Sequence, residues 1–267
     1  MSDEADSKAQ RSLARLLDIM RRLRDPATGC PWDRVQTFAS LAPYTLEEAC
    51  EVVDVLERGD VASLRDELGD LLFQIVFLAQ LAEETAGFDF EAVAGAICDK
   101  LIRRHPHVFA GADAGGDINH TWEALKADER QARGLEGVLS DVPLSLPALS
   151  RAAKLGRRAA RVGFDWPDAA GARDKVHEEL QEFDAAVHSG DEAQMREEMG
   201  DLLLAMTSWA RHLHLDPETS LRQANAKFET RFARMEALAG ERGVALKQLD
   251  PAAWDELWNL AKAATTP

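Results

Sequence analysis

Apolar residues recur at helical spacing in the first half of the chain and predict two consecutive helices. The first helix carries a stripe that follows the i, i+3, i+4, i+7 rule. The stripe consists of Leu46, Ala49, Cys50, Val53 and Leu56. Gly59 is expected to end this helix and Asp60 to cap the next, which should run over residues 61–84. The stretch 68–82 is apolar on nearly all sides, so we expect more than one neighbour to bury it.

The same pattern occurs twice. Residues 47–72 and 178–203 share twelve identical positions of 26, at a constant offset of 131. The shared residues are mostly Glu, Asp and Gly rather than interchangeable apolar residues, which indicates a tandem duplication of one helical domain. We place the boundary near residue 140, so that the predicted domains are 1–140 and 141–267, each an all-α unit.

Composition disfavours several classes of protein. The chain has 31 Lys and Arg against 47 Asp and Glu, a net charge of −16, so no stable nucleic-acid partner is expected. Aromatic residues make up only 6%, which disfavours an all-β fold. Three dispersed cysteines and a polar N-terminus favour a cytoplasmic protein. The most apolar stretch, 71–82, is too short to span a membrane.

The repeated carboxylates suggest a cation site. Glu47, Glu48 and Glu51 share one side of the first helix, and Glu67 and Asp70 lie one turn apart on the second. Because a Gly-Asp corner makes the helices antiparallel neighbours, the two acidic sets can face each other. Four or five converging carboxylates repel unless a cation lies among them, and such oxygen ligands suit Mg²⁺ or Mn²⁺.

Three other roles compete with a Mg²⁺ site for these carboxylates. A lone EExxE is usually a solvated helix face. Glu48 could belong to a capping box with Thr45, but the second copy has Val176 at that place and keeps its glutamate. A di-iron bundle would want Glu-x-x-His pairs rather than Glu-x-x-Asp. Asp70 lies in a run expected to be buried, and Gly69 suggests a close approach of backbone, metal or ligand.

Basic residues follow each acidic set. Lys100 and Arg104 are four residues apart, as are Lys227 and Arg231, and such pairs can hold phosphate oxygens. Ordinary surface charge explains them equally well. A Trp followed four residues later by Lys also occurs twice, at 122–126 and at Trp258–Lys262. The Trp can stack on a base, or it can simply pack into the core of an amphipathic helix.

Several stretches together resemble the MazG family of nucleoside triphosphate pyrophosphohydrolases, in its two-copy bacterial form. The resemblance covers residues 16–262. The stretches are RDPATGCPWD (24–33), YTLEE (44–48), ELGDLL (67–72), RRHPHVF (103–109) and VGFDW (162–166). The family pattern, EExxE followed by ExxD, is present in both copies.

This resemblance implies an all-α fold with a four-helix-bundle-like catalytic core completed by dimerisation, hence a homodimer. It implies Mg²⁺-dependent hydrolysis of the α–β phosphate bond of NTPs and dNTPs, with Mn²⁺ as a substitute ion. The metal ligands carried over to the second copy are Glu179, Glu182, Glu198 and Asp201. A second candidate metal site in the first copy comprises Glu48, Glu51, Glu67 and Asp70.

The resemblance also implies which residues contact the nucleotide. These are Lys175, Glu178, Asn225, Lys227, Arg231 and Trp258, to which the Trp-Lys repeat adds Lys262. Glu178, Glu179 and Glu182 are candidates for the general base, and Lys227 and Arg231 would steady the triphosphate. We expect the second copy to be the main catalyst, because the first has Asp99 beside Lys100, which opposes an anion.

Three functional hypotheses follow. The first is a house-cleaning pyrophosphohydrolase of broad base range. A narrower substrate such as dUTP or phosphoribosyl-ATP keeps the chemistry, but the two-copy layout argues against it. The third is a non-catalytic helical module that binds a nucleotide or a partner protein and regulates it.

Overall fold

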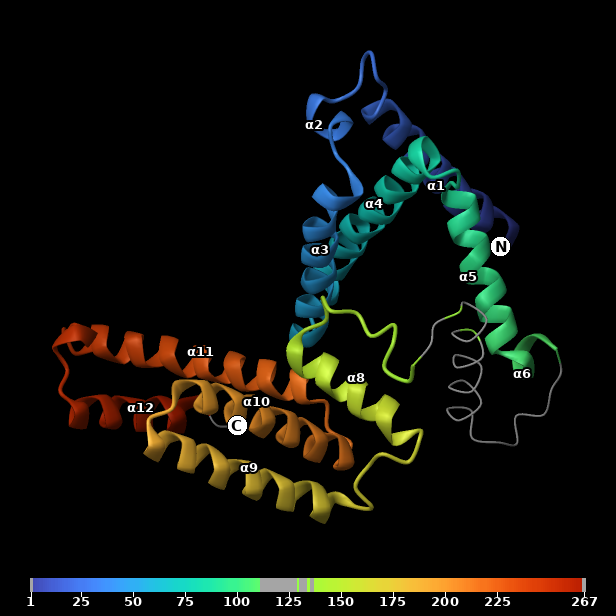
Figure 1. The fold of residues 1–267 in the computed structure, drawn as a ribbon. Coiled ribbons are helices and arrows are strands. Elements are labelled where there is room, and N and C mark those ends of the chain that lie inside the picture. Colours follow the sequence, from blue (N-terminus) through green and yellow to red (C-terminus); the bar gives the residue numbers. More distant parts are fainter. Residues whose placement is uncertain (1, 111–128, 130–133, 135–136, 266–267) are drawn as a thin grey trace. The chain divides into compact units, whose positions relative to one another are not determined.

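The structure, a computed structural model, describes residues 2–110, 129, 134 and 137–265, and the regular elements in these residues are helices. The predicted all-α fold class is confirmed. The chain divides into two compact units, Met1–Lys126 and Ala127–Pro267, and Figure 1 shows the helices of each. Each unit contains one copy of the repeated acidic segment, as a tandem duplication requires. The predicted loop at 111–116 and the first Trp-Lys pair at 122–126 lie outside the described residues, and the boundary at 140 stays a prediction.

The first unit is arranged around a pair of neighbouring helices, α3 and α4 (Figure 1). Its helices are α1 (Ser2–Leu23), α2 (Pro31–Arg34), α3 (Phe38–Arg58), α4 (Val61–Thr85), α5 (Phe90–Arg104) and α6 (Pro106–Phe109). A core of apolar side chains joins α1, α3 and α4. Its buried members are Met20, Leu41, Val76, Phe77 and Leu81.

The turn between α3 and α4 forms as the sequence predicts. Gly59 ends α3 in the left-handed conformation, with φ of 68°, which glycine adopts without a steric penalty. Asp60 then caps α4 by accepting a hydrogen bond from the Ser63 backbone N–H. A turn this short places the acidic face of α3 beside the acidic face of α4.

The second unit repeats this helix pair as α9 and α10. Its helices are α8 (Ala148–Ala160), α9 (Ala169–Ser189), α10 (Glu192–His212), α11 (Pro217–Glu241) and α12 (Pro251–Thr265), with a short 3₁₀ turn η1 (Leu246–Gln248) before α12. Gly190, with φ of 73°, and the N-cap Asp191 rebuild the corner between α9 and α10. The helices α11 and α12 pack together around Met235, Ala239, Leu257 and Ala261.

The predicted apolar stripe on the first helix is not its buried face. The buried side chains of α3 are Leu41, Val52 and Val55. By contrast, Leu46 and Leu56 of the stripe are 50% and 57% exposed. The helix is apolar on two sides, and sequence periodicity alone cannot say which side meets a neighbour in the same unit. The stripe remains a free apolar face of the chain.

The apolar run 68–82 is likewise buried only in part, and this corrects the expectation for its aspartate. Its second half, from Val76 onward, supplies the core, whereas Leu68 and Leu72 are 48% and 39% exposed. Asp70, between those two leucines, is therefore exposed rather than buried, as is Asp201 in the second unit.

The two helical glycines show no close approach. A Cβ atom added at Gly69 or Gly200 would meet no atom within 4 Å. Neither glycine is therefore in close contact with another described segment of the chain, and the expected approach of a metal or ligand stays a prediction.

Within the described residues, no single helix combines the length and apolarity needed to cross a membrane. The pair α4 and α5 meets those two criteria only jointly, with a bend of 115° between them.

Candidate functional site

Three glutamates of the second unit converge between α9 and α10. Glu179 and Glu182 on α9 and Glu198 on α10 each place a carboxylate oxygen within 4.8 Å of the others. Glu179 is only 5% exposed. Burial raises the pKa of Glu198, and the neighbouring charges of Glu182, Glu179 and Asp201 raise it further. The helix corner thus brings three of the four predicted ligands together, and the charge of the fourth, Asp201, acts on the same group.

Lys175 supplies the positive charge beside this cluster. It precedes Glu178 and Glu179 by three and four residues, so all three share one face of α9. Its Nζ lies 2.6 Å from Oε1 of Glu178 and 2.6 Å from Oε1 of Glu179. These hydrogen bonds, first that of Glu178, raise the pKa of Lys175 above its ordinary value. The ammonium thus acts as an internal counter-ion for the buried glutamate.

The first unit brings together the equivalent carboxylates. Glu48 on α3 and Glu67 and Asp70 on α4 lie within 4.8 Å of one another by their oxygens. Glu51, the fourth predicted ligand, acts on this group through its charge. Burial raises the pKa of Glu48, and the charges of Glu51 and Asp70 add to the effect, whereas a hydrogen bond from Gln74 opposes it.

Local helix capping does not explain these glutamates. The helix α3 begins at a capping box formed by Thr37 and Ser40, well before Glu48. The Thr45 hydroxyl donates to the Leu41 carbonyl at 3.0 Å within the helix, so the proposed box of Thr45 and Glu48 is absent. Among the described residues, these two acidic groups are the places where three or more ligand-type side chains meet. Carboxylate oxygens alone suit a hard divalent cation, and the donor set of each cluster fits one.

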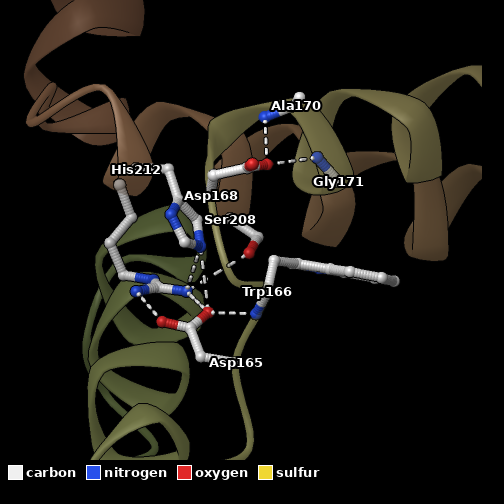
Figure 2. A network of polar contacts seen from close by, with 8 residues as sticks. Asp165, Trp166, Asp168, Ala170, Gly171, Ser208 and His212 are labelled. Atoms are coloured by element: carbon white, nitrogen blue, oxygen red, sulfur yellow. Dashed lines mark hydrogen bonds and ion pairs between the residues drawn. The ribbon is translucent and has the colours of Figure 1, made fainter.

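A polar network sets the position of the segment that leads into α9, and Figure 2 shows it. The Asp165 carboxylate accepts two hydrogen bonds from the Arg211 guanidinium of α10, one of them at 2.9 Å. His212 Nε2 lies 3.0 Å from the same carboxylate. Hydrogen bonding by Arg211 above all lowers the pKa of Asp165 to about 2.

The next residues start α9 itself. Asp168 caps the helix by accepting from the backbone N–H groups of Ala170 and Gly171, at 2.9 and 3.0 Å (Figure 2). The Trp166 ring lies against Gly171, where an added Cβ would come within 3.2 Å of it. Together the two aspartates fix where α9 begins, and Lys175 follows one turn after Gly171.

The two acidic helix pairs match one known protein family. The MazG nucleotide pyrophosphohydrolase domain matches twice, at residues 36–109 and 171–234. The chain belongs to the MazG family. Each match spans one acidic helix pair, α3 with α4 or α9 with α10, so the duplicated unit of the sequence is the MazG domain itself.

Two relatives with a named activity are similar to this chain along nearly their whole length. The nucleoside triphosphate pyrophosphohydrolase of Escherichia coli (strain K12) is 49% identical over 93% of this chain and 96% of its own length. The nucleoside triphosphate pyrophosphohydrolase/pyrophosphatase MazG of Thermotoga maritima is 42% identical over 92% of this chain and 94% of its own. The uncharacterized protein YabN of Bacillus subtilis is 40% identical over 91% of this chain, which matches half of that protein.

Of the seven residues predicted to bind nucleotide, Lys175 and Glu178 lie on α9 beside the carboxylates, and the other five lie on another pair of helices. Asn225, Lys227 and Arg231 are on α11, and Trp258 and Lys262 are on α12. The contact of α11 with α10 is slight compared with the packing of α11 on α12. Each set is assembled locally, the carboxylates between α9 and α10 and the basic and aromatic set between α11 and α12.

Trp258 has two candidate roles, packing in the core of α11 and α12 and binding the nucleotide. It is partly buried against the core of α11 and α12, and its ring centroid lies 5.5 Å from that of Phe228. Arg231 is also partly buried, and its Nε has no hydrogen-bond partner. The packing interpretation of Trp258 therefore holds in part, while nucleotide binding by this residue stays a prediction.

Sequence reasoning missed Gln74, which lies beside Glu48, and the network of Asp165, Arg211 and His212, which holds the segment that leads into α9. Gln74 is hidden in an apolar run, and no pattern around it signals its role. Asp165 lies inside the VGFDW stretch that carried part of the resemblance, so a signal existed there without a stated function. Its partners on α10 are 46 and 47 residues away, beyond the reach of a local pattern.

Proposed function

We propose that this chain is a divalent-metal-dependent nucleoside triphosphate pyrophosphohydrolase that cleaves the α–β phosphate bond and releases a monophosphate and pyrophosphate. The observation that carries the proposal is the convergence of Glu179, Glu182 and Glu198 within 4.8 Å, in a chain whose MazG relatives bear that name. We further propose Mg²⁺ as the ion, with Mn²⁺ as a substitute, and a broad range of bases consistent with house-cleaning.

The second unit is proposed as the catalytic one. Glu179, Glu182, Glu198 and Asp201 would hold the ion. When bound, a divalent ion neutralises phosphate charge and lowers the pKa of a coordinated water. The carboxylates of Glu178, Glu179 and Glu182 are the candidates for taking the proton of the attacking water.

Charge matching supports Lys175 as the residue that links the carboxylates to the substrate. Its ammonium is held by two glutamates in the free chain. An ion bound by Glu179 would take over that balancing charge, and the ammonium could then turn to a phosphate oxygen. Lys227 and Arg231 would steady the triphosphate, and Asn225, Trp258 and Lys262 would line the nucleoside.

The residue beside the predicted phosphate-binding lysine favours the second unit as the catalytic one. Ala226 stands beside Lys227, whereas Asp99 stands beside Lys100 in the first unit. A carboxylate next to a phosphate-binding lysine repels the anion and raises the cost of binding it. We therefore propose that the first unit contributes less to turnover than the second, or none.

A homodimer is proposed on the basis of the free apolar faces. In the second unit, several apolar side chains of α9 and α10 are between 44% and 50% exposed. They are Leu180, Val187, Leu203, Leu204 and Met206. Exposed apolar surface on one helix pair is typical of half a four-helix bundle, and a second copy would bury it. Light scattering on the purified chain should give twice the mass of 29.4 kDa; a monomer at micromolar concentration would count against the dimer.

Product analysis tests the activity. The purified chain would be incubated with each of the eight standard NTPs and dNTPs and Mg²⁺, and the products separated by ion-exchange chromatography. Monophosphate and pyrophosphate, lost on addition of EDTA, are expected. Diphosphate and orthophosphate would indicate cleavage at the γ-phosphate and contradict the proposal. No turnover with either Mg²⁺ or Mn²⁺ would favour a non-catalytic module.

A further inference from the structure

The second unit holds a cavity of about 300 Å³ between α8, the segment that leads into α9, and α10. This volume is close to the lower end of the range for small-molecule sites. Most of its wall is apolar and includes the rings of Phe164 and Trp166, and its polar lining residues are Asp165, Ser208 and Arg211. The residues predicted to hold the ion or the nucleotide are not among those that line it.

The first unit has an aromatic ring of its own at the equivalent position. At the offset of 131, Ser208 corresponds to Phe77, which is 0% exposed. The Phe77 ring centroid lies 6.4 Å from that of Trp32, and the Arg24 guanidinium lies 5.6 Å from the Phe77 centroid. A tryptophan and an arginine also line the cavity of the second unit, which has a serine hydroxyl in place of the ring. The cavity is therefore suited to receive a ring from a ligand.

Arg211 indicates how polar such a ligand should be. Its terminal nitrogens bind the Asp165 carboxylate, so the charge of the guanidinium is balanced within the chain. Its Nε is buried and has no hydrogen-bond partner, and a Cβ added at the lining residue Gly156 would come within 3.2 Å of this atom. A buried donor without an acceptor costs folding free energy. An uncharged ring with an acceptor atom could satisfy Nε, whereas an anion would compete with Asp165.

We propose that this cavity binds an uncharged aromatic heterocycle of one or two fused rings, separate from the substrate, whose ring acceptor pairs with Arg211 Nε. The ring would take the place that Phe77 has in the first unit, beside a tryptophan and a guanidinium. A guanidinium attracts the face of an aromatic ring, which favours such a ligand over an aliphatic one. Phe164, 81% exposed at the same cavity, offers further apolar area for the ring to contact. The site goes beyond the proposed hydrolysis and needs no metal ion.

Calorimetric titration of the full chain with indazole and with indole tests the proposal, without metal or nucleotide. The two probes share one fused-ring shape, but only indazole has a ring nitrogen that accepts a hydrogen bond. One indazole per chain is expected, bound at least about 10-fold more tightly than indole, as one hydrogen bond to a charged group would give. Equal Kd values for the two probes, or no saturable binding of indazole, would overturn the proposal.

Variants that fill the cavity locate the bound ring. Ser208→Leu adds apolar volume from α10 and should weaken the Kd for indazole at least about 10-fold, because two groups cannot occupy one close-packed space. Ser220→Leu makes the same change at an exposed serine of α11 and should leave the Kd unchanged. Thermal melting would verify that each variant is folded. If Ser208→Leu is not, Ala159→Leu fills the same cavity from α8 and decides; an unchanged Kd there would overturn the proposal.

Two further results would show that the cavity has another occupant and would overturn the separate site. A raised KM for dATP hydrolysis in Ser208→Leu, with kcat unchanged, would mean that the ring is the base of the substrate. A change from dimer to monomer in the same variant would mean that a second copy fills the cavity, since Leu204 lines it and also belongs to the proposed dimer face. Indazole binding in a chain that hydrolyses no nucleotide would remove the proposed function and leave this inference standing.

Discussion

The two acidic helix pairs carry the same carboxylates but balance their charge differently. In the second unit the buried Glu179 is paired with the Lys175 ammonium at 2.6 Å. In the first unit burial, together with the charges of Glu51 and Asp70, raises the pKa of Glu48, and the position equivalent to Lys175 is Tyr44. Duplication has preserved the carboxylates and altered what stands beside them. The difference shows that conserved acidic residues do not by themselves fix the charge balance of the helix pair.

The segments that precede the two helix pairs also differ in which charged residue each of them carries. In the first unit Arg24 of the loop reaches Glu84 on α4, with Nε 2.8 Å from Oε1, and lies over the Phe77 ring at 5.6 Å. In the second unit the loop supplies the carboxylate, Asp165, and α10 supplies the arginine. In both units an ion pair attaches the preceding loop to the end of a helix, but the acidic and the basic partner have changed places. We infer that this pair positions the helix and takes no part in chemistry.

Among residues that are not predicted metal ligands, the largest effect on kcat/KM is expected at Lys175. Lys175→Met removes the cation from the second cluster and a proposed ligand of the triphosphate. A hydrogen bond to a charged group contributes about 1.5–3 kcal/mol, so kcat/KM should fall about 10- to 100-fold. The same variant should bind Mn²⁺ more tightly without nucleotide, because no ammonium competes for Glu179. Steady-state kinetics and Mn²⁺ titration check the two effects, with the exposed Lys247→Met as control; weaker Mn²⁺ binding would contradict the counter-ion role.

A smaller effect is expected at Asp165. Its pKa falls from 3.8 unfolded to about 2 folded, so its stabilising contribution is complete above about pH 4 and is lost as the pH falls through 2. Asp165→Asn should lower the free energy of unfolding of the second unit by about 2 kcal/mol at pH 7, and by much less at pH 2. Urea unfolding at the two pH values measures this.

The exposed Asp184→Asn is the control for that experiment. An Asp165→Asn penalty that stays constant from pH 7 to pH 2 would mean that the Arg211 pair does not stabilise the fold.

The smallest effect compares the two helix caps. Asp60→Ala and Asp191→Ala each remove an N-cap side chain at the corner of one helix pair, and each should lower the melting temperature. The two losses should be similar, because each carboxylate accepts two hydrogen bonds: Asp60 from the backbone N–H and hydroxyl of Ser63, and Asp191 from the backbone N–H groups of Ala193 and Gln194. Thermal melting checks both variants. Unchanged stability in either would show that its corner is held by packing alone.

Local patterns predicted the helix pair well. The Gly59 and Asp60 corner, the extent of α4 and the facing carboxylates all follow from residues close in sequence, and the structure confirms them. Their spacing determines backbone geometry and which side chains share a face. For that reason one sequence pattern sufficed to predict both copies.

Burial and long-range pairing were not predictable in the same way. The stripe containing Leu46 and Leu56 predicted the helix correctly but is exposed, because periodicity identifies an apolar face without identifying its partner. The pairing of Asp165 with Arg211 joins residues 46 apart, and nothing local signals it. Gln74 was overlooked because its apolar neighbours dominate the pattern of α4.

One matched pair of variants tests the central claim, that hydrolysis belongs to the second unit. Glu182→Gln and Glu51→Gln change equivalent residues, offset by 131, in the two acidic clusters. Hydrolysis of dATP with Mg²⁺ would be followed by pyrophosphate release for each variant and for the unaltered chain. We predict a fall in kcat/KM at least about 100-fold larger for Glu182→Gln, because Glu182 is a predicted metal ligand of the hydrolytic centre, whereas Glu51 belongs to the unit proposed to contribute less to turnover. Equal losses, or a greater loss for Glu51→Gln, would contradict the account.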